Sequence, residues 1–241
     1  MSNIITQIYG VPRSGGSLVW NILRSMVKVL SPQLPDEWVW QGNDGRRIAY
    51  IAQQNILHNK DIIIIALRDF RDCILSAWRI DPCKAKTPGF ETTTEENLVS
   101  LDDERILDLL KYHQRFYYAL DLYKSRWIND RIIILRYENF YNNYDVIFDK
   151  ILEGVNRVNA LQLTLEESDR ENIKNEWSIE SVKKIQHQYE NFGQWDRSTN
   201  IHGLHIGTAE VGTWTQFLNK EDHAAFTKKL KPELEKWGYE L

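Results

Sequence analysis

The sequence has few cysteines and no long apolar run, the features typical of disulfide-rich, zinc-binding and membrane proteins. Only two of its 241 residues are cysteine, Cys73 and Cys83, so neither a zinc site nor a disulfide framework is indicated, and this usage fits a reducing compartment. The apolar run at residues 4–9 is too short to span a membrane and has no signal-peptide flanks. We therefore expect a soluble, cytoplasmic protein with no membrane partner.

An excess of positive charge is also missing. The chain has 30 Lys and Arg residues against 34 Asp and Glu residues, a formal net charge of −4, so no basic field indicates a nucleic-acid partner. Hydrophobic residues make up 42% and charged residues 27%, which are ordinary values for a globular protein. Because no repeat, low-complexity tract or linker divides the chain, we expect one domain over residues 1–241.

What the sequence does contain is an alternation of predicted strands and helices. Apolar runs predict strands at residues 4–9, 61–69 and 131–138, with a short further candidate at 47–51. Helical patterns cover residues 17–30, 70–79, 102–127, 144–155, 167–177 and 178–186, and a closing helix ends before Gly238. Alternating strands and helices predict an α/β fold: a single-domain, three-layer α/β/α arrangement with a central parallel sheet, like that of P-loop kinases.

The stretch IYGVPRSGGSLVWNIL, residues 8–23, looks like a phosphate-binding loop of the form Gly-x-x-x-x-Gly-Lys-Ser/Thr. Gly10, Gly15 and Ser17 fit this pattern, but Gly16 takes the place of the lysine, and the nearest cation is Arg13. Between a buried strand and a helix, the backbone N–H groups of such a turn bind an anion. The alternative is an ordinary strand-to-helix turn.

The missing lysine bears on which anion the loop binds. In a nucleoside triphosphatase that lysine reaches the β- and γ-phosphates, and the Ser17 hydroxyl would hold magnesium. A sulfuryl group lacks the second negative charge of a terminal phosphoryl group, so an arginine and backbone donors suffice for it. A sulfuryl group is thus one example of a less charged group that could bind here without the lysine and the metal ion, and we expect no metal site.

A second basic motif, ALRDFRDCILSAWR at residues 66–79, follows another predicted strand. It places Arg68 at the strand end and Ser76 eight residues later, two turns into the next helix. The forked guanidinium group of arginine matches the geometry of a phosphate. The alternative is a surface Arg–Asp pair beside a helical serine with no particular role.

Together, the two motifs resemble those of the sulfotransferase family that uses 3′-phosphoadenosine-5′-phosphosulfate (PAPS). The family's 5′-phosphosulfate loop reads like Tyr-Pro-Lys-Ser-Gly-Thr-Thr where this chain has VPRSGGS. Its 3′-phosphate segment reads like Arg-Asp-Pro-Arg-Asp-x-x-x-Ser where this chain has RDFRDCILS. The resemblance implies a PAPS-binding site formed by Pro12, Arg13, Ser14, Gly15, Gly16, Ser17, Arg68 and Ser76.

Weaker resemblances extend along the rest of the chain. LRYENF is similar to a family segment whose tyrosine, here Tyr137, contacts adenine, and the segment from Gly212-x-Trp214 onward is similar to the family's C-terminal helix. The family's Arg-Lys-Gly clamp on the 3′-phosphate is altered here: its nearest match is HIG, which implies roles for His205 and Gly207. The family's dimerisation motif is not recognisable. WSIESVKKIQ resembles a family segment along the adenosine, which implies Trp177, Ser178, Ile179 and Val182 there.

By this resemblance, the chain transfers a sulfuryl group from PAPS to a hydroxyl or amine of a small-molecule or glycan acceptor. Arg13 takes the place of the family's lysine and is the predicted catalytic residue that stabilises charge on the leaving oxygen. Ala52 takes the place of the histidine that often serves the family as general base. His58 is therefore the candidate catalytic base, with Glu37 and Asp44 as alternatives.

Two further points stay open. Trp38 and Trp40, two residues apart, are candidates for the wall of an acceptor pocket, although tryptophans more often pack in a core. The chain is alternatively a P-loop kinase of a small metabolite, or a non-catalytic nucleotide-binding protein on the same fold.

Overall fold

The computed structural model describes residues 2–43, 62–79, 98–126, 129–191, 193–203, 206–207 and 209–241. By their contacts these residues fall into two compact units. The sheet unit comprises Met1–Gly10, Gly15–Leu67 and Ala119–Ser181, and the helical unit comprises Val11–Ser14, Arg68–Tyr118 and Val182–Leu241. The chain passes between the units several times, and the expectation of one domain over the whole chain stays a prediction.

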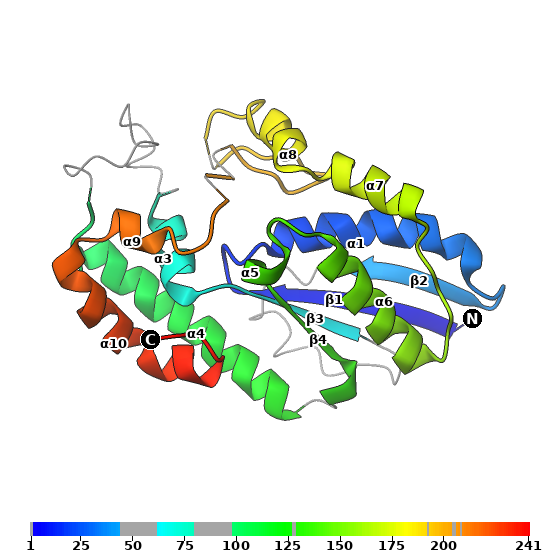
Figure 1. The fold of residues 1–241 in the computed structure, drawn as a ribbon, viewed down its shortest axis with the longest axis horizontal. Helices are drawn as coiled ribbons and strands as arrows, with labels where there is room; N and C mark the ends of the chain where they lie inside the picture. Colours follow the sequence, from blue (N-terminus) through cyan, green and yellow to red (C-terminus); the bar gives the residue numbers. More distant parts are fainter. Residues whose placement is uncertain are drawn as a thin grey trace. The chain divides into compact units, whose positions relative to one another are not determined.

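The sheet unit contains four parallel strands in the order β2-β1-β3-β4 (Figure 1). Helices flank this sheet, so the predicted α/β class with a central parallel sheet is confirmed. The candidate strand at 47–51 lies outside the described residues. The strands are β1 (Ser2–Gly10), β2 (Trp38–Asn43), β3 (Ile62–Leu67) and β4 (Ile132–Arg136).

Strand β3 forms the most apolar part of the sheet because all six of its side chains are buried. Its run of isoleucines suits this position, since β-branched side chains pack well on a pleated surface that is covered on both faces. In the register, Gly10 of β1 lies opposite Ala66, and Leu67 lies opposite Arg136 of β4. Three neighbouring strands therefore end at one edge of the sheet, where parallel sheets carry their ligand sites.

The helices of the sheet unit bury one apolar stripe each. Helix α1 (Gly16–Leu30) packs on β1 and β2, and α6 (Asp145–Asn159) packs on β3 and β4. In α1 the buried stripe repeats every three to four residues and includes Val19, Ile22, Leu23, Met26 and Leu30. The other elements are α5 (Tyr137–Phe140), α7 (Glu167–Glu176), and two 3-10 turns at Ser31–Gln33 and Asn129–Arg131.

The helical unit is built on α3 (Phe70–Arg79), which contacts both α9 (Trp214–Phe217) and α10 (His223–Lys236). The closing helix before Gly238 is confirmed as α10, and a 3-10 turn at Lys220–Asp222 separates it from α9. Two helices contribute residues to both units, α4 (Glu104–Arg126) and α8 (Ile179–Gln186). Among the described helices, none has the length and apolar character needed to span a membrane.

Candidate functional site

The loop between β1 and α1 has the backbone of an anion-binding turn. The N–H of Ser14 donates to the carbonyl of Val11 over 3.0 Å, which closes a turn, and Arg13 and Gly15 both have left-handed backbone, with φ of 72° and 84°. Gly15 is the N-cap of α1 and supplies no side-chain hydrogen bond. The first-turn N–H groups of α1 are therefore not capped by that residue, and they add the partial positive charge of a helix N-terminus.

Gly15 is required in this loop for two independent reasons. Its positive φ is costly for any residue with a Cβ atom. In addition, a Cβ atom at this position would lie 2.8 Å from Cδ2 of the Tyr137 ring and 3.1 Å from Phe140. The buried ring of Tyr137 therefore packs directly against the loop backbone. A contact between Tyr137 and adenine stays a prediction.

Gly16, in contrast, is not forced by packing. A Cβ atom there would meet only the Cα of Gly10, at an ordinary 3.9 Å. The absence of a lysine at this position therefore does not follow from a lack of space for a side chain. It fits a loop whose ligand does not need that cation.

The hydroxyl of Ser14 has no hydrogen-bond partner although its residue is fully buried. A buried polar group without a partner costs about 1–3 kcal/mol. Such a group is stabilised when a ligand or a water molecule supplies the missing hydrogen bond. Ser14 therefore fits a loop that holds an oxygen-rich ligand.

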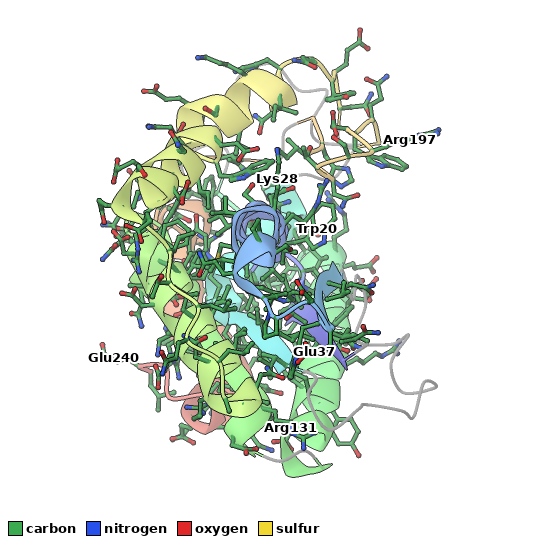
Figure 2. The ribbon with its side chains drawn as sticks, turned by 90° about the vertical axis from the view of Figure 1, so that its right-hand side faces the viewer. Trp20, Lys28, Glu37, Arg131, Arg197 and Glu240 are labelled. Atoms are coloured by element: carbon green, nitrogen blue, oxygen red, sulfur yellow. The ribbon has the colours of Figure 1, made fainter. Side chains whose placement is uncertain are left out.

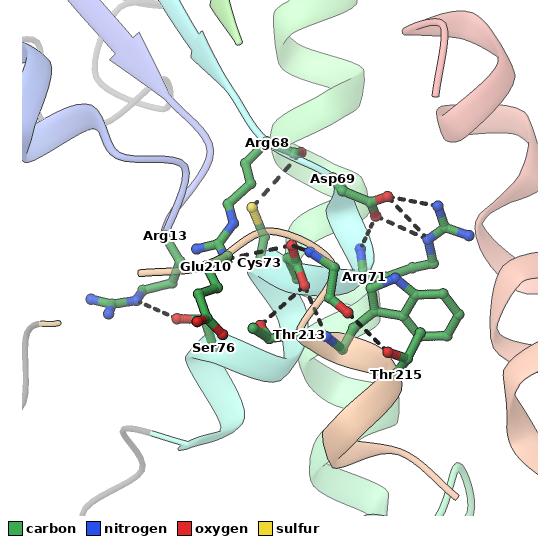
Figure 3. A network of polar contacts seen from close by, with 12 residues as sticks. Arg13, Arg68, Asp69, Arg71, Cys73, Ser76, Glu210, Thr213 and Thr215 are labelled. Carbon is green, nitrogen blue, oxygen red and sulfur yellow. Dashed lines mark hydrogen bonds and ion pairs between the residues drawn. The ribbon is translucent and has the colours of Figure 1, made fainter. Parts of the chain in front are cut away.

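The helical unit brings the two basic motifs together. Nε of Arg13 donates to Oγ of Ser76 over 3.1 Å, although 63 residues separate them in the sequence (Figure 3). Arg68, next along the chain after β3, donates from Nη2 to the carbonyl oxygen of Glu210 over 2.7 Å. The same nitrogen lies 3.4 Å from Oδ2 of Asp72. Two arginines and a serine from the predicted donor site thus belong to one network of polar contacts.

Asp72 organises the backbone of the segment that leads into α9. Its carboxylate, in a residue only 1% exposed, accepts hydrogen bonds from the N–H groups of Gly212 and Trp214 at 2.8 and 2.9 Å, and from Oγ1 of Thr213 at 3.3 Å. Neither of the two sequence motifs predicts a role for this carboxylate. Its local signal in the sequence is its spacing of four residues after Arg68.

A second pair in the same motif has a structural role. Nη2 of Arg71 lies 2.6 Å from Oδ2 of Asp69, and its guanidinium group stacks 4.6 Å from the centre of the Trp214 ring (Figure 3). Arg71 also donates to the hydroxyl of Thr227 and to the carbonyl of Glu240. Arg71 and Asp69 thus form a buried pair, and the roles of Arg68 and Ser76 stay a prediction.

Trp177 and Ser178 have hydrogen-bond partners within the sheet unit. The Trp177 indole N–H donates to Oγ of Ser25 over 3.0 Å, and Trp177 is only 6% exposed. Oγ of Ser178 accepts from the N–H of Ser181 over 3.2 Å and so caps the start of α8. The hydroxyl of Tyr144 donates to the carbonyl of Trp177, and burial raises the pKa of this tyrosine to about 12. Their contact with adenosine, and that of Ile179, stays a prediction.

The fold has counterparts among solved structures. No family model matches the sequence, and no curated protein does either. The chain is similar to mouse sulfotransferase SULT7A1 complexed with PAP: the TM-score is 0.58 and the identity is 12%, over 97% of this chain and 84% of that one. This chain has the sulfotransferase fold.

A second similar structure is that of retinol dehydratase in complex with androsterone and inactive cofactor PAP. The TM-score is 0.48 and the identity is 10%, over 99% of this chain and 82% of that one. At 12% identity, the similarity to the mouse sulfotransferase establishes the fold and leaves the chemistry to the residues of this chain.

The residues predicted to serve the acceptor side of this sulfotransferase fold are less well defined. His58 and Asp44 lie outside the described residues, as does His205, which was predicted for the 3′-phosphate clamp. Glu37 is exposed in the turn before β2 (Figure 2). Trp40 is only 3% exposed, and its indole N–H donates to Oγ1 of Thr6 over 2.9 Å, so it is a core residue that joins β2 to β1.

Proposed function

We propose that this chain is a sulfotransferase that moves a sulfuryl group from PAPS to a hydroxyl or amine group of an acceptor. The observation that carries the proposal is the hydrogen bond from Arg13 to Ser76. It joins a phosphate-type loop that has no lysine to a motif with an arginine and a serine spaced for a second phosphate. A ligand with one phosphosulfate group and one phosphate group matches this pair of motifs.

The residues of the loop fit the phosphosulfate end of PAPS. Backbone N–H groups at the uncapped start of α1 and the buried hydroxyl of Ser14 are available to oxygen ligands. Gly15 lets the loop backbone pack against the rings of Tyr137 and Phe140, which hold it in place at the start of α1. Gly16 offers no cation, which suits a terminal group that carries less charge than a phosphoryl group. PAPS would supply an activated sulfuryl group whose leaving group is a phosphate.

Arg13 is the proposed catalytic residue because it is the cation of the loop. Its left-handed backbone and its hydrogen bond to Ser76 orient the guanidinium group before any ligand binds. Negative charge grows on the leaving oxygen as the sulfuryl group departs, and a pre-oriented donor stabilises that charge in the transition state. Arginine is too weak an acid to release a proton at neutral pH, so its role is electrostatic.

Arg68 and Ser76 are the proposed ligands of the 3′-phosphate. Arg68 is only 7% exposed and is held by Asp72 and by the carbonyl of Glu210, so little conformational entropy remains to be lost on binding. Hydrogen bonds from guanidinium to phosphate are charge-assisted and stronger than those between neutral groups. This site would distinguish PAPS from nucleotides without a 3′-phosphate.

The acceptor is proposed to be a small molecule or a glycan, since a hydroxyl or amine is the group that PAPS sulfates. An acceptor of this kind requires a base to remove its proton, and His58 is the proposed base. We propose a cytoplasmic enzyme that needs no metal ion.

The direct experiment is a transfer assay with sulfur-labelled PAPS against panels of phenols, alcohols, amines and oligosaccharides. Appearance of label on any acceptor, with release of PAP, supports the proposal. Phosphoryl transfer from ATP in the presence of magnesium would instead make the chain a kinase. Binding of PAP without transfer to any acceptor class would favour a non-catalytic nucleotide-binding protein.

A further inference from the structure

We infer that Arg79 is a second arginine of the proposed 3′-phosphate site, beside Arg68, and that Gly207 allows it to take up that position. This inference rests on the proposed binding of PAPS and names a residue that none of the sequence motifs assigns. The ligand group is the phosphate monoester at the 3′ position of the nucleotide.

The position of Arg79 on α3 places it beside Ser76. The two residues are three apart in the helix, so their Cβ atoms are neighbours on one face, about 5–6 Å apart. Both side chains are only partly buried, so each can reach a ligand. Ser76 already accepts a hydrogen bond from Arg13. A phosphate held by Ser76 would therefore lie within reach of the guanidinium groups on either side.

Gly207 shows where the guanidinium group of Arg79 lies. A Cβ atom built on Gly207 would overlap Nη1 and Cζ of Arg79, so the guanidinium group lies directly over the Cα of this glycine. The φ of Gly207 is not in the left-handed region, so the backbone conformation does not itself require glycine. A Cβ atom at 207 is therefore excluded only as long as the guanidinium group of Arg79 stays in this position.

The backbone beside Gly207 is held in place. Gln186, which is 6% exposed, accepts from the N–H of Ile206 through Oε1 at 2.5 Å and donates to its carbonyl through Nε2 at 3.3 Å. A doubly hydrogen-bonded residue next to Gly207 gives the guanidinium group a fixed surface to lie on. Arg79 is thus oriented by the fold, as a residue that binds a phosphate needs to be.

A phosphate monoester in the helical unit needs more positive charge than Arg68 alone supplies. Arg71 is engaged with Asp69 and Trp214, and Arg68 shares its charge with Asp72. A phosphate monoester carries close to two negative charges at neutral pH, and planar guanidinium groups bind it with paired hydrogen bonds. Asp72 neutralises part of the charge of Arg68. Arg79 would add positive charge to balance the phosphate.

A different role for Arg79 is the stabilisation of its own helix, because a cation in the last turn interacts favourably with the helix dipole. The two roles differ in what they do to ligands. A helix-stabilising arginine affects all nucleotides equally, whereas a phosphate ligand affects only those with a 3′-phosphate.

The test is calorimetric binding of PAP and of adenosine 5′-monophosphate, which lacks the 3′-phosphate, to the full chain. Arg79→Met is expected to weaken PAP binding about 10- to 100-fold, the range for one charge-assisted contact, and to leave the monophosphate unchanged. Arg79→Lys keeps the positive charge but loses the paired N–H donors of the guanidinium group. Its affinity for PAP should therefore lie between those of the wild type and Arg79→Met. Arg197→Met, which removes an exposed arginine from a loop of the same unit, is the matched control and should change neither affinity (Figure 2).

Gly207→Ala provides the second variant. It forces only the flexible end of Arg79 to move, so the fold should tolerate it, and PAP binding should weaken in the wild-type background. In the Arg79→Met background the same change should have no further effect, because no guanidinium group remains to be displaced. An equal effect of Gly207→Ala in both backgrounds would overturn the inference.

The outcomes separate this inference from the function on which it rests. The wild type and Arg79→Met are compared by the ratio of their affinities for PAP and the monophosphate. If the wild type binds PAP more tightly and this ratio is the same in Arg79→Met, the role proposed for Arg79 is wrong and the proposed function is unaffected. If the wild type shows no preference for PAP, the proposed 3′-phosphate site is wrong and the inference falls with it.

Discussion

The Cα of Gly15 lies so close to the ring of Tyr137 that a Cβ atom there would be 2.8 Å from Cδ2 of the tyrosine. This contact ties the loop after β1 to the residue that follows β4, over 122 positions of the sequence. It fixes the loop backbone at the point where α1 begins and where the proposed phosphosulfate site lies.

Replacement of Gly15 by alanine should therefore destabilise the fold. The left-handed backbone alone makes alanine unfavourable by about 1–2 kcal/mol, and the overlap with Tyr137 adds to this. Gly16→Ala is the matched control, since a Cβ there meets only an ordinary contact, and it should change stability by no more than about 0.5 kcal/mol. Urea unfolding of both variants measures the difference, and equal stabilities would contradict the packing described for the loop.

Arg13 should matter more for turnover than for binding. Because charge on the leaving oxygen develops during the reaction, Arg13→Ala is expected to lower single-turnover transfer about 10²–10³-fold while weakening nucleotide binding much less. Arg13→Lys should retain far more activity than alanine. If Arg13 only braces the loop through Ser76, alanine would reduce binding and stability together, and lysine would give no special rescue.

Arg68 should determine the preference for a 3′-phosphate. Arg68→Ala is expected to weaken PAP binding by about 2–4 kcal/mol and to leave adenosine-5′-phosphosulfate, which lacks that phosphate, about as well bound as before. Because the change also leaves Asp72 without its cation, the melting temperature must be followed in parallel. Unaltered discrimination between the two nucleotides would show that Arg68 has another role.

Asp72 should be essential for the segment that leads into α9. An asparagine cannot accept all three hydrogen bonds that the carboxylate now accepts from residues 212–214, and it leaves Arg68 without its negative partner. We expect Asp72→Asn to reduce stability by about 3–5 kcal/mol. The control is Asp108→Asn, which removes an exposed pair with Lys111 and should have little effect. A small effect at Asp72 would mean that the segment is held by other contacts.

His113 should make the fold sensitive to acid. It is fully buried in α4 without a hydrogen-bond partner, and burial lowers its pKa to about 3. Between pH 6.5 and 3 the unfolded chain binds a proton that the folded chain does not, so stability falls as the pH is lowered, by up to about 1.4 kcal/mol per pH unit from this group. His113→Met should flatten the stability profile over this window, and a profile unchanged by the substitution would refute the assignment.

The fold was predictable because its signals are local. The isoleucine run of β3 and the three-to-four-residue stripe of α1 are both visible in the sequence, and the α/β alternation follows from them. The glycine requirement at residue 15 was also visible as part of a loop motif. The sequence does not predict that the ring of Tyr137 excludes a Cβ atom at residue 15, because Tyr137 belongs to a different strand–helix connection.

The details of the site were less predictable because long-range contacts leave no local signal. Asp72 binds backbone about 140 residues away, and Arg79 lies over Gly207, which comes from a loop after α8. Trp40 has the spacing of a pocket residue, yet it is a core residue bonded to Thr6. For each of these residues, tertiary packing decides which partner it contacts. The neighbouring sequence does not indicate that partner.

The central claim, that the loop without a lysine holds a phosphosulfate nucleotide, is tested most directly by nucleotide affinity in the presence and absence of magnesium. PAP should bind to the metal-free protein and raise its melting temperature, with no gain on addition of magnesium. ATP should bind much more weakly under both conditions, because the loop has no lysine for its terminal phosphates. Tighter binding of ATP than of PAP, or a requirement for magnesium, would contradict the claim.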